Sequence, residues 1–219
     1  MRSFLKKSCL VLRVAPFLVT FSGAVNAANF TFDADPFQGS AALTTPGRQI
    51  VGNELFTPFS IASDVFVFDS EIFPLSNLYF ANDVVGNLPA SGVNLVVLQT
   101  FDNDANAATP FGAGTAANLI ADQITTAGPG FFIYFNSGLD LPRLVYSTDL
   151  SDNTADLKIL ARLTNLTGQD GRDAIPTFTS ENFKLVAVPD SAGNLIYLMA
   201  AGALVACRYA FARRLEPQN

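Results

Sequence analysis

Histidine and tryptophan are absent from the 219-residue sequence, and cysteine occurs only twice, as Cys9 near the start and Cys207 near the end. Without histidine, neither a serine–histidine–acid triad nor a cysteine–histidine pair can be assembled. The usual zinc ligands are also missing between the two cysteines, and no disulfide can form there. The sequence therefore excludes the commonest hydrolytic sites and predicts a central body stabilised by its core alone, or by metal ions.

Positive charge is also scarce. The chain has 13 basic and 19 acidic residues, a net charge of −6 and a pI of about 4.5. Nucleic-acid binding needs a basic face for the phosphates, so this balance argues against a nucleic-acid partner. Hydrophobic residues make up 49% of the chain and 20 of them are phenylalanines, which argues against disorder and suggests a large aromatic core. The length suits one domain with appendages.

The first 27 residues have the composition of an export signal. Basic residues from Arg2 to Arg13 precede the apolar stretch 14–21, and the small residues Val25 and Ala27 precede the expected cut. We expect signal peptidase to cleave between Ala27 and Ala28. The alternative is a membrane anchor that is never cleaved, for which the apolar stretch is short.

A second apolar segment lies close to the C-terminus. The run Leu195–Cys207 contains no charged residue, and a helix extended to Ala212 would contain 18 residues. Such a helix rises about 27 Å, close to the hydrocarbon thickness of a bilayer. Arg208, Arg213 and Arg214 form a basic cluster that we expect on the cytoplasmic side, with the preceding chain outside. The segment predicts a transmembrane helix; a buried core helix is the alternative.

Four residues directly before this helix form a short motif, Val188, Pro189, Asp190 and Ser191. Proline fixes φ and aspartate stays hydrated, so the peptide is held extended at the membrane surface. Residues 188–214 contain the motif, the predicted helix and the basic cluster, and a short tail follows at 215–219. Together these features resemble the VPDSG-type variant of the PEP-CTERM class of bacterial sorting signals. The resemblance implies recognition by an exosortase, a membrane cysteine protease-transpeptidase. It also implies delivery to the cell surface or an exopolysaccharide matrix in Gram-negative bacteria.

Residues 28–187 remain as one ectodomain, and their apolar patterning is mostly that of strands. Continuous or alternating apolar segments predict strands at 29–32, 65–68, 93–101, 131–135, 144–146, 157–163 and 178–186. The segments 144–146 and 157–163 are joined by turn formers and predict a hairpin with one solvated face. Pro, Gly, Asn and Asp residues lie between these segments. The pattern predicts a mainly β fold, a single β-sandwich or jelly-roll-like domain.

One short helix is expected within this β domain. Thr115 is a suitable N-cap for a helix over 116–124, which would place Ala116, Leu119, Ile120 and Ile124 on one face. The helix would pack against a sheet.

Acidic turns offer the best metal candidates. Asp102, Asp104 and Asn106 alternate as in the opening of a calcium loop, although the glycine and glutamate of an EF-hand are missing. A second cluster lies in the expected hairpin turn and comprises Asp149, Asp152 and Asp156. Asx residues are also ordinary turn formers. We therefore expect no obligatory cofactor and keep calcium as a possibility.

A structural or adhesive protein of the cell surface or matrix, without enzyme activity, is the expected function. The alternative is a carbohydrate- or calcium-dependent binding module with exopolysaccharide as partner, for which Tyr79, Tyr134 and Tyr146 are the only ectodomain tyrosines. A third class is a glycoside hydrolase built on two carboxylates, drawn from the many acidic residues, among them Glu54, Glu71 and Glu181.

Overall fold

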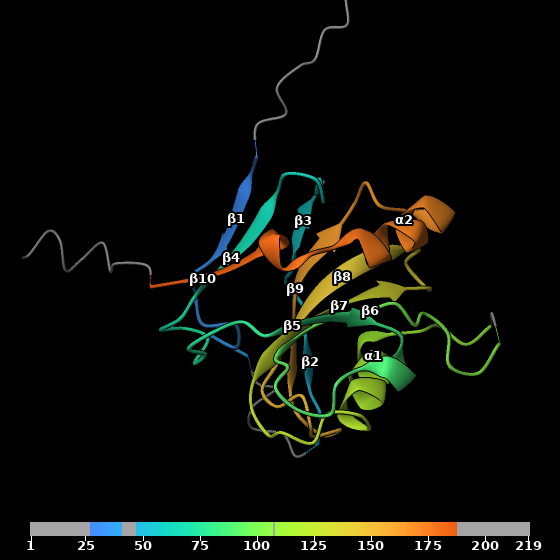
Figure 1. Ribbon diagram of the computed structural model, residues 1–219, viewed down its shortest axis with the longest axis horizontal. Helices are drawn as coiled ribbons and strands as arrows, with labels where there is room; N and C mark the ends of the chain where they lie inside the picture. Colours follow the sequence, from blue (N-terminus) through green and yellow to red (C-terminus); the bar gives the residue numbers. More distant parts are fainter. Residues whose placement is uncertain (1–26, 41–46, 107, 188–219) are drawn as a thin grey trace, which may run out of the picture.

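The computed structural model describes residues 27–40, 47–106 and 108–187. Its elements are β1 (Asn29–Phe32), β2 (Ile50–Val51), β3 (Leu55–Thr57), β4 (Val65–Asp69), β5 (Phe80–Asp83), β6 (Leu95–Leu98), α1 (Ala113–Ala121), β7 (Gly130–Asn136), β8 (Leu141–Ser147), β9 (Leu157–Leu163), α2 (Gly168–Ala174) and β10 (Phe183–Val186) (Figure 1). Ala27 and Ala28, which flank the expected cut, are described, whereas the rest of the predicted export signal, the predicted sorting motif, the apolar run and the basic cluster lie outside these ranges. Within the described ranges, no helix has the length and apolarity needed to span a membrane.

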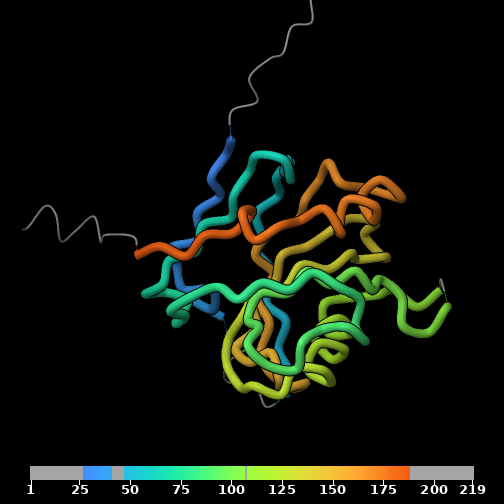
Figure 2. The backbone as a smooth tube through the Cα atoms, in the orientation of Figure 1, coloured from blue at the N-terminus to red at the C-terminus, as the bar shows by residue number. Residues whose placement is uncertain are grey.

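The first and last described strands belong to one small sheet. β1 and β10 lie on either side of β4, and both run parallel to it. Phe30 of β1 and Phe183 of β10 flank Phe66 of β4. We call β1, β4 and β10 the terminal sheet, since it joins both ends of the described chain (Figure 2).

The remaining strands form a larger sheet, called the main sheet below, in the order β2-β9-β8-β7-β6-β5, with β3 also paired to β9. The long central strands β7, β8 and β9 are joined in antiparallel fashion, which confirms the predicted hairpin. The solvated face expected for this hairpin is wrong, because every residue of β9 except Arg162 is buried, Lys158 included. β5 and β6 extend the sheet on one side and β2 and β3 on the other, all in parallel pairs.

Aromatic side chains fill the space between the two sheets. Phe68 of β4 stacks on Phe131 of β7, with ring centroids 3.8 Å apart. Phe73 meets Phe131 and Tyr146 edge-on, at 5.1 and 4.9 Å. These side chains are almost fully buried, so each removes a large apolar area from water. The sheets therefore share one core, in agreement with the expectation of a large aromatic core, although Phe56 and Phe101 are exposed.

The opposite face of the main sheet is covered by α1. Ala116 and Ile120 pack into a second cluster with side chains from the main sheet, and Ile124 is buried beyond the helix end. The predicted helix is thus confirmed, but its start is not. α1 begins at Ala113 with Gly112 as N-cap, so Thr115 lies inside the first turn and caps nothing. Burial of Ala113 extends the apolar face one turn earlier than the sequence pattern indicated.

A second short helix, α2, was not predicted because it has no apolar face of helical period. Tertiary contact determines its position instead. A side chain at Gly171 would collide with the backbone carbonyl of Leu166, so only glycine permits this close approach. Gly168, at the first position of α2, has a φ of 62°, a left-handed conformation that favours glycine.

The strand pairing differs from that of a jelly roll. Jelly rolls and immunoglobulin-like sandwiches are built from antiparallel strands, whereas here only the β7–β8 and β8–β9 pairs among the described strands are antiparallel. The mainly β prediction is confirmed, but the jelly-roll topology does not match. The last strand is also shorter than the predicted 178–186, since Ser180–Asn182 forms a 3₁₀ turn directly before β10.

Candidate functional site

The loop with Asp102, Asp104 and Asn106 is exposed and connects β6 to α1. Asp102 Oδ1 accepts hydrogen bonds from the amides of Asp104 and Ala105, both at 3.0 Å, and Asp104 Oδ1 accepts one from Asn106 at 2.9 Å. These are Asx turns, in which a side-chain oxygen binds the backbone just beyond it. The structure brings the three residues into one loop, but one oxygen of each aspartate is already used locally.

The second acidic cluster lies in the turn between β8 and β9, and a distant arginine joins it. Arg48 donates hydrogen bonds to the carbonyl oxygens of Asp152 and Ala155, at 3.1 and 3.0 Å. Asp149 Oδ1 accepts from the Ser151 amide at 2.8 Å. The turn between β8 and β9 is therefore held by hydrogen bonds to Arg48, which precedes β2. No group of three or more acidic or cysteine side chains in the described ranges is placed to hold a metal ion.

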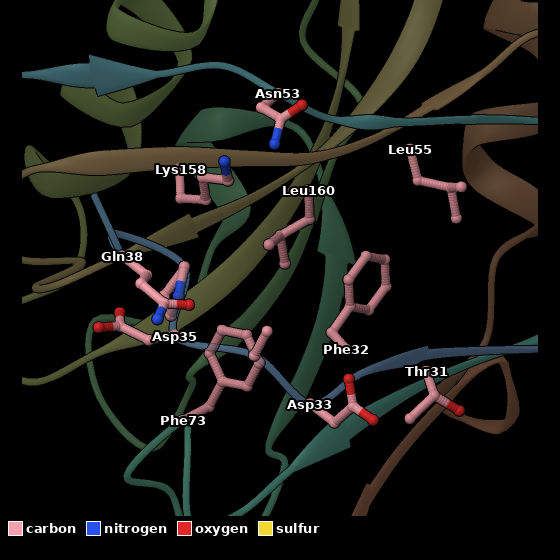
Figure 3. Close-up of a pocket in the computed structure, with 12 residues that line it drawn as sticks. Thr31, Phe32, Asp33, Asp35, Gln38, Asn53, Leu55, Phe73, Lys158 and Leu160 are labelled. Atoms are coloured by element: carbon pink, nitrogen blue, oxygen red, sulfur yellow. The ribbon is translucent and has the colours of Figure 1, made fainter. Parts of the chain in front are cut away.

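A pocket of about 400 Å³ opens where the terminal sheet meets the main sheet. The segment 31–38, which ends β1 and continues past it, forms one wall, and Asn53 and Leu55 border the opposite side. Figure 3 shows Leu160 pointing from β9 toward Phe32 and Phe73. Lys158 and Leu160 stand two residues apart on β9, so they face the same side of the strand. The pocket therefore combines an apolar floor with a polar rim.

Hydrogen-bonding side chains dominate this rim. Asp33, Asp35, Gln38 and Asn53 are exposed, and the nearby Lys158 is buried. The Lys158 ammonium donates to the carbonyl oxygen of Gly52. Burial lowers the pKa of Lys158, against the opposing effect of the Glu54 carboxylate. Carboxylates and amides offer acceptors and donors together, a set that suits the hydroxyls of a sugar better than an apolar ligand.

Beside the pocket, Glu54 pairs with two arginines of the main sheet. Its Oε1 lies 2.9 Å from Nη2 of Arg143 and also accepts a hydrogen bond from Nε of Arg162. Burial acts to raise the pKa of Glu54, but the hydrogen bonds that its carboxylate accepts from its own backbone amide and from Arg162, together with the charges of Arg143 and Arg162, lower it overall. A catalytic general acid needs a raised pKa. Glu54 is therefore held as an anion by the two arginines and does not fit the general-acid role of a glycosidase pair, whose second carboxylate is ionised.

The other candidates considered from the sequence lie in separate elements. Glu71 follows β4, and Glu181 lies in the turn before β10; both are exposed. Tyr134 and Tyr146 are core residues, and burial raises the pKa of Tyr146 to about 12, aided by the charge of Asp35. Only the third tyrosine, Tyr79, is exposed, at 52%, and it borders a smaller pocket of about 270 Å³.

The rim residues were not identified from the sequence. Asp33, Asp35 and Gln38 follow the first strand as ordinary turn formers, and Asn53 follows Gly52 in the same way. A turn composition predicts a loop but does not say which other loop it will face. The pairing of β2 and β3 with β9 brings Asn53 to the segment 31–38, and that pairing has no local signal.

No protein-family model, curated protein or solved structure matches this chain. Among the described residues, the pocket with its polar rim lies beside the Glu54–arginine cluster.

Proposed function

We propose that the chain is an exported protein, sorted by an exosortase to the cell surface or an exopolysaccharide matrix, where its β domain has a structural or adhesive role. The best support is the agreement between the strands and the two sequence signals. β1 begins at Asn29, just after Ala28, and β10 ends at Val186, just before the motif at Val188. Cleavage at both expected positions would leave every described strand intact.

The direction of the terminal strands fits a domain tethered at its C-terminal end. Asn29 pairs with Val65 at the start of β4, whereas Val186 pairs with Asp69 at its end. At about 3.3 Å per residue, these two ends lie about 13 Å apart along the strand direction. A domain held at the membrane by the segment after Val186 would therefore direct its Ala28 end away from the membrane.

The stabilisation of the domain is also compatible with a passive role outside the cell. The two sheets are held by stacked aromatic rings, such as Phe68 on Phe131, and need no disulfide. Residues 28–190 carry 18 acidic and 6 basic side chains, a difference of 12 negative charges. Such a charge favours solubility of the released domain.

The intact mass of the protein recovered from native cells tests this proposal. We expect a chain that starts at Ala28 and ends between Pro189 and Ser191. Pro189→Ala and Asp190→Ala should each trap the protein in the cell envelope of a strain that has the exosortase. Asp122→Ala replaces an exposed acid after α1 and should leave release unchanged. Normal release of both motif variants would refute sorting.

Glycan binding at the pocket is a second candidate function, favoured by the exposed polar rim around Phe32. The protein should then be retained on the host's own exopolysaccharide, and Asp33→Ala together with Gln38→Ala should reduce that retention severalfold. Asp122→Ala, outside the pocket, is the matched control. Absence of retention would leave the structural role. Turnover of the polysaccharide that is lost on replacing one carboxylate would instead indicate a hydrolase.

A further inference from the structure

Asp64 is a buried carboxylate directly before β4, with only 7% of its surface exposed. Its Oδ2 accepts a hydrogen bond from the Ser60 amide at 2.8 Å, and its Oδ1 accepts one from the Ser63 hydroxyl at 3.2 Å. Oδ1 also accepts a hydrogen bond from the backbone nitrogen of Ala28, at 2.9 Å. All three donors are neutral groups.

A buried carboxylate is normally paired with a cation. Both ion pairs of the described residues involve Glu54, and neither involves Asp64. Burial acts to raise the pKa of Asp64, but the hydrogen bonds from Ser60, Ala28 and Ser63 lower it overall. Asp64 is therefore ionised at neutral pH and has no positive partner in the part of the chain that the structure describes.

The missing positive charge would be supplied by export processing. Signal peptidase adds water across the Ala27–Ala28 peptide bond. Ala27 then leaves with the new carboxylate, and the Ala28 nitrogen takes up a proton to become an ammonium. That nitrogen is the atom already bonded to Asp64. The Ala28 carbonyl is also held, because it accepts a hydrogen bond from the Val65 amide at 2.9 Å.

We propose that Asp64 is the receptor for the N-terminal ammonium of the processed protein, and that this ion pair fastens β1 to β4. The proposal rests on the export function above, since it requires cleavage between Ala27 and Ala28. A charged donor makes a shorter and stronger hydrogen bond to a carboxylate than a neutral amide does. The terminal sheet is therefore held more tightly in the cleaved chain than in the precursor.

Asp64 also has a hydrogen bond with a residue next to β10, the other outer strand of the terminal sheet. The side-chain amide of Asn182, just before β10, donates to the carbonyl oxygen of Asp64 at 3.1 Å and to that of Ile61 at 2.7 Å. A change at Asp64 thus affects contacts with both outer strands of the terminal sheet. The position of the cut matters as well, because one additional residue would carry the ammonium up to about 3.5 Å further along the chain, out of hydrogen-bond reach.

The test uses the processed protein purified from an exporting host, with its N-terminus verified by intact mass. The α-amine is selectively acetylated in one sample, which removes its charge, and reductively dimethylated in another, which keeps it. We expect acetylation to lower the Tm by roughly 4–8 °C and dimethylation by less than roughly 2 °C. Asp64→Asn should abolish the difference between the two modifications. Asp69→Asn, a change of another buried carboxylate at the far end of β4, should retain it.

An insertion keeps the test decisive where Asp64→Asn fails to fold. One alanine inserted between Ala27 and Ala28 leaves the cleavage signal unchanged but yields a product one residue longer. We expect this product to melt at a Tm close to that of the acetylated wild type and not to respond to acetylation.

The possible failures are distinguishable. A chain that starts at a residue other than Ala28, or that keeps its leader, would refute both the expected cut and the ion pair. A chain that starts at Ala28 but melts at the same Tm after acetylation would overturn the ion pair and leave export standing. An equal response to acetylation in wild type and Asp64→Asn would do the same.

Discussion

The central strand of the main sheet and the first strand of the terminal sheet differ sharply in burial. All seven residues of β7 are buried, whereas the four residues of β1 alternate between exposed and half-buried. β7 directs Phe131 and Ile133 toward the terminal sheet and Phe132 and Tyr134 toward the cluster under α1. β1 contributes only its two phenylalanines to one core face.

This difference indicates where the stability of the domain resides. Strands covered on both faces open only with the whole fold, whereas a strand held on one face can open locally at lower cost. We therefore expect β7 to open only with the whole domain and β1 to open more easily. The outer strands β1 and β10, which form the ends of the described chain, are less buried than β4 between them, so we expect contacts made by these strands to have the larger effect on local opening.

The largest expected effect tests this comparison directly. Phe131→Ala removes a ring stacked on Phe68 inside the shared core, and we expect it to reduce the free energy of unfolding by about 4 kcal/mol. Phe32→Ala removes a half-buried ring of β1 and should cost about 1 kcal/mol. Urea unfolding of both variants measures the difference. Equal losses would refute the ranking of the two strands.

Glu54→Gln tests the two ion pairs that Glu54 makes with Arg143 and Arg162 of the main sheet. Removing the carboxylate leaves Arg143 and Arg162 without their partner, and we expect a loss of about 3 kcal/mol at neutral pH. Because folding lowers the pKa of Glu54, its contribution is complete above its ordinary pKa of 4.5 and is lost as the pH falls through the folded value. The stabilities of wild type and variant should therefore converge in acid.

Stability measured against pH provides the readout for this variant, and Glu71→Gln is the control because Glu71 is exposed. A stability difference between wild type and Glu54→Gln that stays constant down to pH values of about 2 would contradict the charge-based explanation.

Asn182→Ala tests the attachment of β10. The Asn182 side chain is 4% exposed and donates to two carbonyl oxygens, those of Ile61 and Asp64. Leaving these acceptors without a partner should cost about 2 kcal/mol in thermal or urea unfolding. Asn153→Ala replaces an exposed asparagine in the β8–β9 turn and should be close to neutral. A neutral Asn182→Ala would show that β10 is held by its ladder alone.

The smallest effect is expected outside both sheets. Asp102→Ala breaks an Asx turn in an exposed loop and should change the free energy of unfolding by no more than about 0.5 kcal/mol. We also expect millimolar calcium to leave the Tm unchanged, with magnesium and a chelator as controls. A rise in Tm with calcium in the wild type but not in Asp102→Ala would establish a calcium site in this loop.

The local predictions from the sequence succeeded where a strand or helix is defined by its own apolar pattern. The run 65–68 is a buried strand, the segments before and after Asp149 form a hairpin, and a helix covers 116–121. Predictions that depended on distant partners were less successful. Neither the parallel pairing nor the short helix α2 has a local signature, since α2 is positioned by the close contact of Gly171 with Leu166.

The candidate site shows the same division. From the sequence, Glu54 is one of several carboxylates that could serve a glycoside hydrolase. Its ion pairs could not be predicted, because both arginines lie more than 80 positions away in the sequence. Asp64 directly precedes the strand predicted at 65–68, and nothing in the sequence marks it as buried. Its contact with Ala28 depends on the register of β1 on β4, which a pattern of buried and exposed positions cannot specify.

The sequence by itself determined the absence of histidine chemistry and internal disulfides and the burial of the phenylalanine-rich segments, and it predicts the two terminal signals on which the export proposal rests. These follow from residue types and local periodicity, which need no knowledge of the fold. Only the tertiary structure decided that strands 36 residues apart, such as those of Phe30 and Phe66, run side by side in parallel, and which charges they bring together. Strand pairing is selected by packing across the whole core, so the contacts it creates cannot be derived from any one segment.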